Sequence, residues 1–214
     1  MTQRELTLHG YWRSSSSYRV RIALAWKGLS YEYVAVNLLA GDHRGATYRA
    51  IAATGFVPAL SIDGHVIVES MAICELLEEL VPTPALLPAD PFRRAFARSF
   101  ALTVASRIQP FQNLSTLQAH PAENRGAVAR AAIEPGLAVL ELLLDREVPE
   151  GEGSFCAGVA PSLADVFLVP QLYAARRFGV DLAPYPRLVR SDAAAAQLPA
   201  FRAAHPDLQP DAVV

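Results

Sequence analysis

The pattern of hydrophobic residues changes near residue 82, and this change constrains the fold more than any other feature of the sequence. Before residue 82, short runs rich in β-branched and aromatic residues alternate with helical patterns. After it, helical patterns rich in Ala, Leu and Arg follow one another, and no segment alternates like a strand. Four prolines between residues 82 and 91 disfavour helix in the residues that precede them. We therefore predict an α/β domain over residues 1–82, a linker over 83–91 and an all-helical domain over 92–214.

The first part has the pattern of a small sheet with helices. Four segments have the composition or alternation of strands, at residues 6–9, 31–36, 57–62 and 65–68. The last two flank Asp63-Gly64, a pair that strongly favours a tight hairpin. Helices are predicted from the serines at 14–17 to Gly28, over 46–53, and from a Ser70 cap onwards. The order βαβ, α, hairpin, α is that of a thioredoxin-like domain, although other small α/β folds share such alternation.

The second part predicts five helices, at residues 92–106, 108–119, 122–145, 163–178 and 190–204. The fourth begins with Ser162 and Asp165, spaced as a capping box in which Asp replaces the usual Glu. The two cysteines, Cys74 and Cys156, form no CxxC pair, and we expect both to be small buried residues. The five histidines have no metal-ligand spacing, so no metal site is predicted.

The composition argues against several classes of protein. Of 214 residues, 52% are hydrophobic and 19% are charged, so the chain can bury a sizeable core and is not disordered. Its net charge of −2 creates no field that attracts nucleic acid or anionic lipid. No apolar run approaches the roughly 18–20 residues that span a bilayer, and the first ten residues lack the apolar stretch of a signal peptide. We expect a cytoplasmic globular protein without nucleic-acid or membrane partners.

Residues 11–24, YWRSSSSYRVRIAL, resemble the active-site signature of the zeta-class glutathione transferases, the family of the maleylacetoacetate isomerases. Shorter matches cover nearly the whole chain, namely VPAL at 57–60, ESMAI at 69–73, LLP at 86–88, IQP at 108–110, QNL at 112–114, LVPQ at 168–171, RFGVDL at 177–182 and PYP at 184–186. The resemblance implies the cytosolic glutathione transferase fold, in which an all-α domain follows a thioredoxin-like α/β domain. It also implies a homodimer, glutathione as the cofactor, and a small dicarboxylate with a cis double bond as the substrate.

The serines at the start of the first predicted helix fit two roles. One of them can simply cap the helix, because Ser is a preferred N-cap residue. A helix N-terminus also carries unpaired N–H groups and a partial positive charge, which lower the pKa of a thiol placed there. By similarity, the Ser14 hydroxyl donates a hydrogen bond to the sulfur of glutathione, and Ser15 is a second donor. Ser16, the third catalytic candidate, stands where many zeta enzymes carry a cysteine, so the protein supplies no thiol of its own there.

The resemblance assigns further glutathione contacts. Val57-Pro58 is expected to form a cis peptide that exposes the backbone of Val57 to the cysteinyl amide. Glu69 and Ser70 are expected to hold the γ-glutamyl end, with Ser70 on its carboxylate. Glu69 replaces the glutamine that is commoner in this class, and its carboxylate can pair with the ammonium group of glutathione. The remaining expected contacts are His43, Gln109, Asn113, Leu114 and Ser115.

Two arginines are candidate anchors for the carboxylates of the substrate. A guanidinium group suits this role because it can hold a carboxylate through two parallel hydrogen bonds. Arg13 lies beside the serine loop, and Arg177 occupies a position where relatives place a substrate arginine. Arg19 and Arg21 are assigned to the helix surface or to an interface.

The resemblance implies a glutathione-dependent cis–trans isomerase that converts maleylacetoacetate into fumarylacetoacetate in tyrosine and phenylalanine catabolism. The expected route is thiolate addition, rotation about the resulting single bond, and elimination. Three alternatives stay open: a maleylpyruvate isomerase, a transferase that conjugates or dehalogenates small α-halo acids, and a glutathione-binding scaffold without chemistry. The presence of both Arg13 and Arg177 favours an enzyme, because a scaffold needs no substrate anchors.

Overall fold

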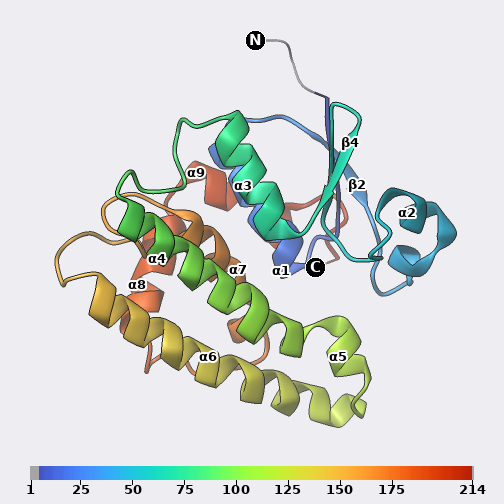
Figure 1. Cartoon of the computed structure of the whole chain (residues 1–214). Helices are drawn as coiled ribbons and strands as arrows, with labels where there is room; N and C mark the ends of the chain where they lie inside the picture. Colours follow the sequence, from blue (N-terminus) through green and yellow to red (C-terminus); the bar gives the residue numbers. More distant parts are fainter. Residues whose placement is uncertain (1–4, 214) are drawn as a thin grey trace. The chain divides into compact units, whose positions relative to one another are not determined.

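The structure, a computed structural model, describes residues 5–213 and consists of two compact units (Figure 1). The first unit comprises the described residues up to Pro84 together with those from Pro199 onwards, and the second comprises Ala85–Leu198. The α/β content of the first unit and the helical content of the second confirm the predicted fold class. In the described part of the chain, no helix combines the length and the apolar character needed to cross a membrane.

Within residues 5–84, the first unit builds a four-stranded mixed sheet with the spatial order β2-β1-β3-β4. Its strands are β1 (Leu6–Gly10), β2 (Glu32–Ala35), β3 (Ala59–Ile62) and β4 (His65–Val68). β1 and β2 are parallel, whereas β3 is antiparallel to both of its neighbours. Asp63 and Gly64 have φ values of 47° and 84°, the left-handed values that a type I′ hairpin turn requires. The predicted hairpin is therefore confirmed.

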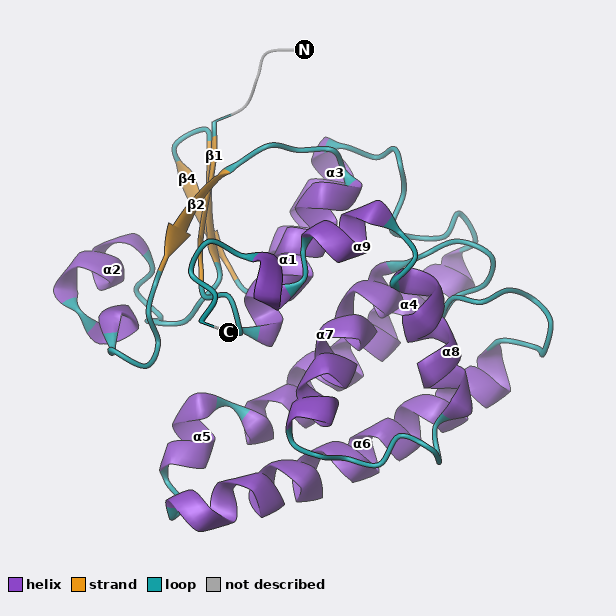
Figure 2. Cartoon of the chain, turned by 180° about the vertical axis from the view of Figure 1, so that it is seen from behind, coloured by secondary structure: helices purple, strands orange, loops and turns teal. Residues whose placement is uncertain are grey.

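The helices of the first unit cover both faces of this sheet. They are α1 (Ser15–Trp26), α2 (Ala46–Ile51), α3 (Ser70–Leu80) and α9 (Pro199–Ala203). Figures 1 and 2 show α1, α3 and α9 on one side of the sheet and α2 on the other. α1 ends before Gly28, as predicted, and Gly28 has the positive φ of 66° that favours glycine after a helix. The predicted Ser70 cap is wrong, because Glu69 occupies the N-cap position and Ser70 is the first helical residue.

The second unit is built from helices, and nearly all residues of α7 are buried in it. Its described elements are α4 (Pro91–Leu102), the π-helical turn η2 (Thr103–Ile108), the 3₁₀ turn η3 (Gln109–Gln112), α5 (Leu114–Gln118), the 3₁₀ turn η4 (Ala122–Asn124), α6 (Arg125–Glu147), α7 (Leu163–Arg177) and α8 (Pro186–Ala195). α7 packs against α4 and α8. Ser162 accepts a hydrogen bond from the Ala164 N–H, and Asp165 accepts one from the Ser162 N–H, so the predicted capping box is confirmed.

Two of the predicted helices are interrupted. The helix predicted over 108–119 breaks at Asn113, whose ψ of 153° is extended. The helix predicted over 190–204 is wrong as one element, because the structure divides this region between α8 and α9. Pro199 explains the division, since proline lacks the N–H that continues a helix and disfavours helix in the residue before it.

The C-terminal segment, residues 199–213, belongs to the first unit. The sequence prediction instead extended the helical domain to residue 214. Phe201 and Ala204 are almost fully buried, at 1% and 2% exposure. Arg21 Nε of α1 donates a 3.0 Å hydrogen bond to the carbonyl oxygen of Ala204, which is 183 residues away along the chain. Hydrophobic periodicity does not reveal such a return of the chain.

Both cysteines are buried free thiols, as predicted. Burial raises the pKa of Cys74 to about 12. Burial also raises the pKa of Cys156, and the neighbouring Asp165 carboxylate raises it further. Both thiols therefore stay protonated at neutral pH.

Candidate functional site

One end of the sheet gathers the site residues predicted for the first unit. His9 at the end of β1 pairs with Ala59 at the start of β3, and Ala59 pairs with Val68 at the end of β4. The loop that follows β1 therefore begins beside the residues that precede β3 and those that follow β4. This topology brings together three predicted segments, residues 13–16, 57–58 and 69–70.

The loop after β1 is a tight turn that presents Ser14 at the N-terminus of α1. The Ser14 N–H donates a 3.0 Å hydrogen bond to the Tyr11 carbonyl oxygen. Ser14 is the N-cap of α1, and its Oγ accepts a 3.2 Å hydrogen bond from the Ser17 N–H. This bond uses the oxygen as an acceptor and leaves the hydroxyl proton available to donate. The capping role and the predicted role toward a sulfur are therefore compatible.

Ser15 and Ser16 form the first turn of α1 and are partly exposed. N–H groups in the first turn of a helix have no acceptor within the helix, and the helix dipole is positive at this end. An anion placed beside these residues is stabilised. Ser17 has a different role, because it is fully buried and its Oγ accepts a 3.4 Å hydrogen bond from the Tyr11 N–H.

Arg13 lies in the same turn, with its guanidinium carbon 5.3 Å from the centre of the Trp12 ring. Trp12 is only 7% exposed, so the ring offers a fixed surface for this cation–π contact. The contact holds the positive charge of Arg13 against the Trp12 ring, and Arg13 directly precedes Ser14 in the chain.

The peptide bond between Val57 and Pro58 is cis, as predicted. Val57 is buried in a cluster that includes Tyr11 and Trp12 of the serine loop. The Tyr48 hydroxyl donates a 2.7 Å hydrogen bond to the Phe56 carbonyl oxygen, which fixes the chain just before the cis peptide.

Glu69 and Ser70 form the N-terminus of α3. Ser70 is 5% exposed, and its Oγ accepts a 3.1 Å hydrogen bond from Arg19. As at Ser14, this leaves the hydroxyl proton available for a ligand carboxylate. Glu69 is exposed and has φ 70° and ψ 115°, a conformation that residues other than glycine rarely adopt. Such strain tends to occur at functional sites, where it helps to hold a ligand.

Arg19 and Arg21 are predicted on the helix surface or at an interface, and of these the helix surface is wrong, because the two side chains are buried at 1% and 0% exposure. Burial lowers the pKa of Arg19 to about 10, which leaves it charged at neutral pH, while the nearby Glu69 carboxylate opposes this shift. The charge of Arg19 therefore lies beneath Ser70, where it favours an anion.

His43 lies in the 3₁₀ turn η1 (Asp42–Arg44). Arg44 Nε donates a 3.2 Å hydrogen bond to His43 Nε2, so the neutral ring carries its proton on Nδ1. Burial and the positive charge of Arg44 lower the pKa of His43, which favours this neutral form. His43 Nδ1 is buried and has no hydrogen-bond partner among residues 5–213, so it can donate to a ligand.

In the second unit, the structure brings two predicted glutathione contacts together. Gln109 of η3 donates a hydrogen bond from Nε2 to Asn113 Oδ1. Leu114 and Ser115 follow directly in the first turn of α5, where Leu114 is partly buried and Ser115 is exposed. The predicted substrate anchor Arg177 is the exposed last residue of α7.

Sequence reasoning missed a pair of amide side chains that links the region of Gln109 and Asn113 to the helix that carries Arg177. The side chains of Gln112 and Gln171 exchange hydrogen bonds of 2.9 and 3.2 Å and are 6% and 0% exposed. Gln112 ends η3, and Gln171 lies on α7, the helix that ends at Arg177. The two glutamines are 59 residues apart, and no local pattern links them.

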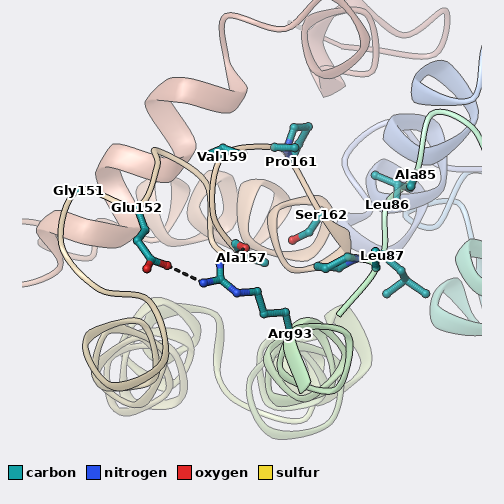
Figure 3. A pocket seen from close by; sticks show the side chains of 13 residues that line it. Ala85, Leu86, Leu87, Arg93, Gly151, Glu152, Ala157, Val159, Pro161 and Ser162 are labelled. Atoms are coloured by element: carbon teal, nitrogen blue, oxygen red, sulfur yellow. Dashed lines mark hydrogen bonds and ion pairs between the residues drawn. The ribbon is translucent and has the colours of Figure 1, made fainter. Parts of the chain in front are cut away.

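A cavity of about 520 Å³ lies elsewhere in the second unit (Figure 3). The chain before α4 and the loop before α7 line it, and no predicted site residue does. Arg93 and Glu152 line it and form a 2.6 Å ion pair with each other. This pair satisfies both of the charged side chains that line the cavity.

Comparisons with known proteins identify the family of the chain. The family model "Glutathione S-transferase, N-terminal domain" matches residues 13–80. The chain is 47% identical to maleylacetoacetate isomerase of Pseudomonas aeruginosa, over 96% of this chain and 98% of the relative.

Two solved structures are similar to nearly the whole chain. One is a zeta-class bacterial maleylpyruvate isomerase in its holo form, with a TM-score of 0.93, 41% identity, and coverage of 97% of this chain and 100% of that one. The other is maleylacetoacetate isomerase of Anaeromyxobacter dehalogenans with dicarboxyethyl glutathione and citrate in the active site, with a TM-score of 0.87, 49% identity, and coverage of 100% and 96%. These similarities confirm the predicted family: the chain belongs to the zeta class of the glutathione S-transferases, together with the maleylacetoacetate isomerases.

Proposed function

We propose that this protein is a glutathione-dependent isomerase that converts maleylacetoacetate into its trans isomer, fumarylacetoacetate. The observation that carries the proposal is the place of Ser14, at the N-terminus of α1 with its hydroxyl proton free to donate. The 47% identity to a maleylacetoacetate isomerase over 96% of the chain supports the choice of substrate.

The residues of the first unit fit glutathione as the cofactor. When bound, glutathione supplies a thiolate that can add to the activated double bond and leave again after rotation. The Ser14 hydroxyl and the N-terminus of α1 stabilise negative charge on a sulfur, which lowers the pKa of the thiol. Ser15 is the proposed second donor, and Ser16 completes the polar turn.

Four further groups are proposed to hold the rest of glutathione. Ser70, backed by the buried charge of Arg19, binds the γ-glutamyl carboxylate, and Glu69 pairs with the ammonium group. The backbone of Val57, before Pro58, pairs with the cysteinyl amide. The unsatisfied Nδ1 of His43 supports a contact to a carboxylate. The proposed contacts from the second unit are Gln109, Asn113, Leu114 and Ser115.

Arg13 and Arg177 are proposed to anchor the two ends of the substrate. Each guanidinium can bind one carboxylate or the polarised oxygen of the keto acid through two hydrogen bonds. Fixing both ends places the double bond against the thiolate, and such positioning contributes much of the rate of an addition reaction.

We also propose that the protein acts as a homodimer in the cytoplasm, which its similarity to the zeta class supports. Sedimentation of the purified protein tests the dimer.

The test follows maleylacetoacetate at a glutathione concentration far below that of the substrate. We expect product in large molar excess over glutathione, with the free thiol unchanged at the end. Loss of one thiol for each substrate consumed would instead identify a conjugating transferase, and binding without turnover would identify a scaffold. Parallel assays with maleylpyruvate decide between the two isomerase activities.

The Ser14→Ala variant tests the role of this hydroxyl. Removal of a hydrogen-bond donor to a developing anion lowers activity by about a hundredfold or more. Ser30, an exposed loop serine beyond the other end of α1, supplies the matched control Ser30→Ala. Equal activity of the two variants would refute the assignment of Ser14.

A further inference from the structure

The turn that carries Ser14 is held by groups from α1 and from the distant C-terminal segment. Within this turn, the Tyr11 carbonyl oxygen accepts a hydrogen bond from the Ser14 N–H. The side-chain and carbonyl oxygens of Ser14 accept hydrogen bonds from N–H groups of α1. The peptide groups on either side of Trp12 are bound by other residues, Arg21 of α1 and Asp211 of the C-terminal segment.

Arg21 uses its guanidinium group to join the turn to the C-terminal segment. Its terminal nitrogens donate to the carbonyl oxygens of Trp12, at 2.9 Å, and of Tyr11, at 3.5 Å. Its Nε donates to the Ala204 carbonyl oxygen at 3.0 Å. The planar guanidinium holds its donors in a fixed arrangement and serves three carbonyl groups, and Arg21 is fully buried while it does so.

Asp211 of the C-terminal segment binds the turn at the N–H of Trp12. Its Oδ2 accepts a 3.0 Å hydrogen bond from the Trp12 N–H. Its charge also acts on Arg21 and on Tyr33 of β2: burial raises the pKa of Tyr33, and Asp211 raises it further. Ala212, the next residue, packs on the cluster that contains Tyr11 and Trp12. The C-terminal segment therefore contacts both the backbone and the side chains of the turn.

We propose that Arg21 and Asp211 are positioning residues of the glutathione site: they fix the backbone of Tyr11 and Trp12, and the C-terminal segment thereby sets the place of the Ser14 hydroxyl. The inference rests on the proposed role of Ser14 in stabilising the thiolate. The N–H of Trp12 lies two residues before Ser14, so a turn freed from Asp211 moves the hydroxyl relative to the N-terminus of α1.

The test compares Asp211→Ala, Asp211→Asn and the control Asp207→Ala by the ultraviolet absorbance of bound glutathione thiolate as a function of pH. Asp211→Ala is expected to raise the pKa of the bound thiol by about one unit, which means about tenfold less thiolate below that pKa. Asp211→Asn keeps an oxygen for the Trp12 N–H, and we expect it to restore much of this loss. Asp207 lies on the same segment but pairs with His205, so its replacement leaves the thiol pKa unchanged.

Two further measurements separate positioning from general instability. In steady state, Asp211→Ala is expected to lower kcat more than it raises the KM for glutathione, because the Ser70 end of the site is untouched. Unfolding midpoints verify that each variant is folded at the assay temperature. Arg21→Lys tests the other positioning residue. Lysine keeps the positive charge but lacks the planar arrangement of donors that binds three carbonyl groups, so we expect the same rise in the pKa of the bound thiol.

The outcomes distinguish this inference from the proposed function. If Ser14→Ala abolishes the thiolate signal while both Asp211 variants match the wild type, the positioning role is refuted and the proposed function stands. If Ser14→Ala leaves the signal unchanged, the role of Ser14 is refuted, and the positioning role falls with it.

Discussion

The strained backbone of Glu69 predicts that glycine and alanine at this position differ in protein stability, although both substitutions remove the same carboxylate. Glu69 has φ 70° and ψ 115°, and a residue with a Cβ held in such a conformation costs about 1–3 kcal/mol. Glycine removes this strain but loses about 0.5–1 kcal/mol more backbone entropy on folding. The Glu69 side chain is exposed and makes no cap bond, so its removal sacrifices no packing. We therefore expect Glu69→Gly to be more stable than Glu69→Ala by about 1–2 kcal/mol.

The comparison between the glycine and alanine variants isolates the strain, because both lack the carboxylate and its interaction with Arg19. Free energies of unfolding measured in urea without glutathione provide the magnitude. Glutathione titrations provide the second readout, in which both variants are expected to bind more weakly than the wild type, whereas Glu69→Gln retains more of the affinity. Equal unfolding free energies for the glycine and alanine variants would refute the strain argument.

Two further predictions concern packing and thiol chemistry. A Cβ added to Gly136 of α6 would lie 2.3 Å from Ile108 Cγ1, so Gly136→Ala is expected to lower the free energy of unfolding by about 1–3 kcal/mol. The control Gly126→Ala meets its nearest side-chain atom at 3.6 Å and is expected to be neutral or stabilising, by urea unfolding of both variants. Because burial raises the pKa values of Cys74 and Cys156, neither thiol should react with a maleimide in the native protein at mildly alkaline pH. Labelling counted by mass spectrometry before and after unfolding tests this, and a native adduct would contradict it.

Local signals in the sequence predict the elements that local chemistry determines. Asp63-Gly64 predicts its hairpin because few other pairs accept two left-handed residues, and the observed φ values agree. Gly28 predicts the end of α1 for the same reason, and the capping box of Ser162 and Asp165 needs only a spacing of three. In each case the competing structures are few and close in sequence.

The two arginines of α1 could not be placed from the sequence, because one hydrogen-bond partner of each lies far along the chain. A charged side chain inside an amphipathic pattern is usually exposed, since burial of an unpaired charge is costly. Arg19 and Arg21 are buried because Ser70 and Ala204 supply oxygen acceptors for them, across 51 and 183 residues. The resemblance to a known family identified the serine turn, but nothing in the motif itself indicates that these arginines support it.

The return of the chain to its first unit has a consequence for synthesis on the ribosome. The α/β unit is discontinuous, so its sheet and first helices emerge long before the residues that brace the serine turn. A nascent chain of only the first 198 residues lacks the acceptors at Ala204 and Asp211. In this chain, one of the three carbonyl partners of Arg21 is missing, and so is the carboxylate that binds the Trp12 N–H. The helical unit, by contrast, is continuous in sequence, so it can fold before the C-terminal segment is translated. The helical unit is thus expected to complete its fold before the α/β unit, although most of the α/β unit is translated first. The turn that carries Ser14 is then among the last parts of the molecule to reach its final structure.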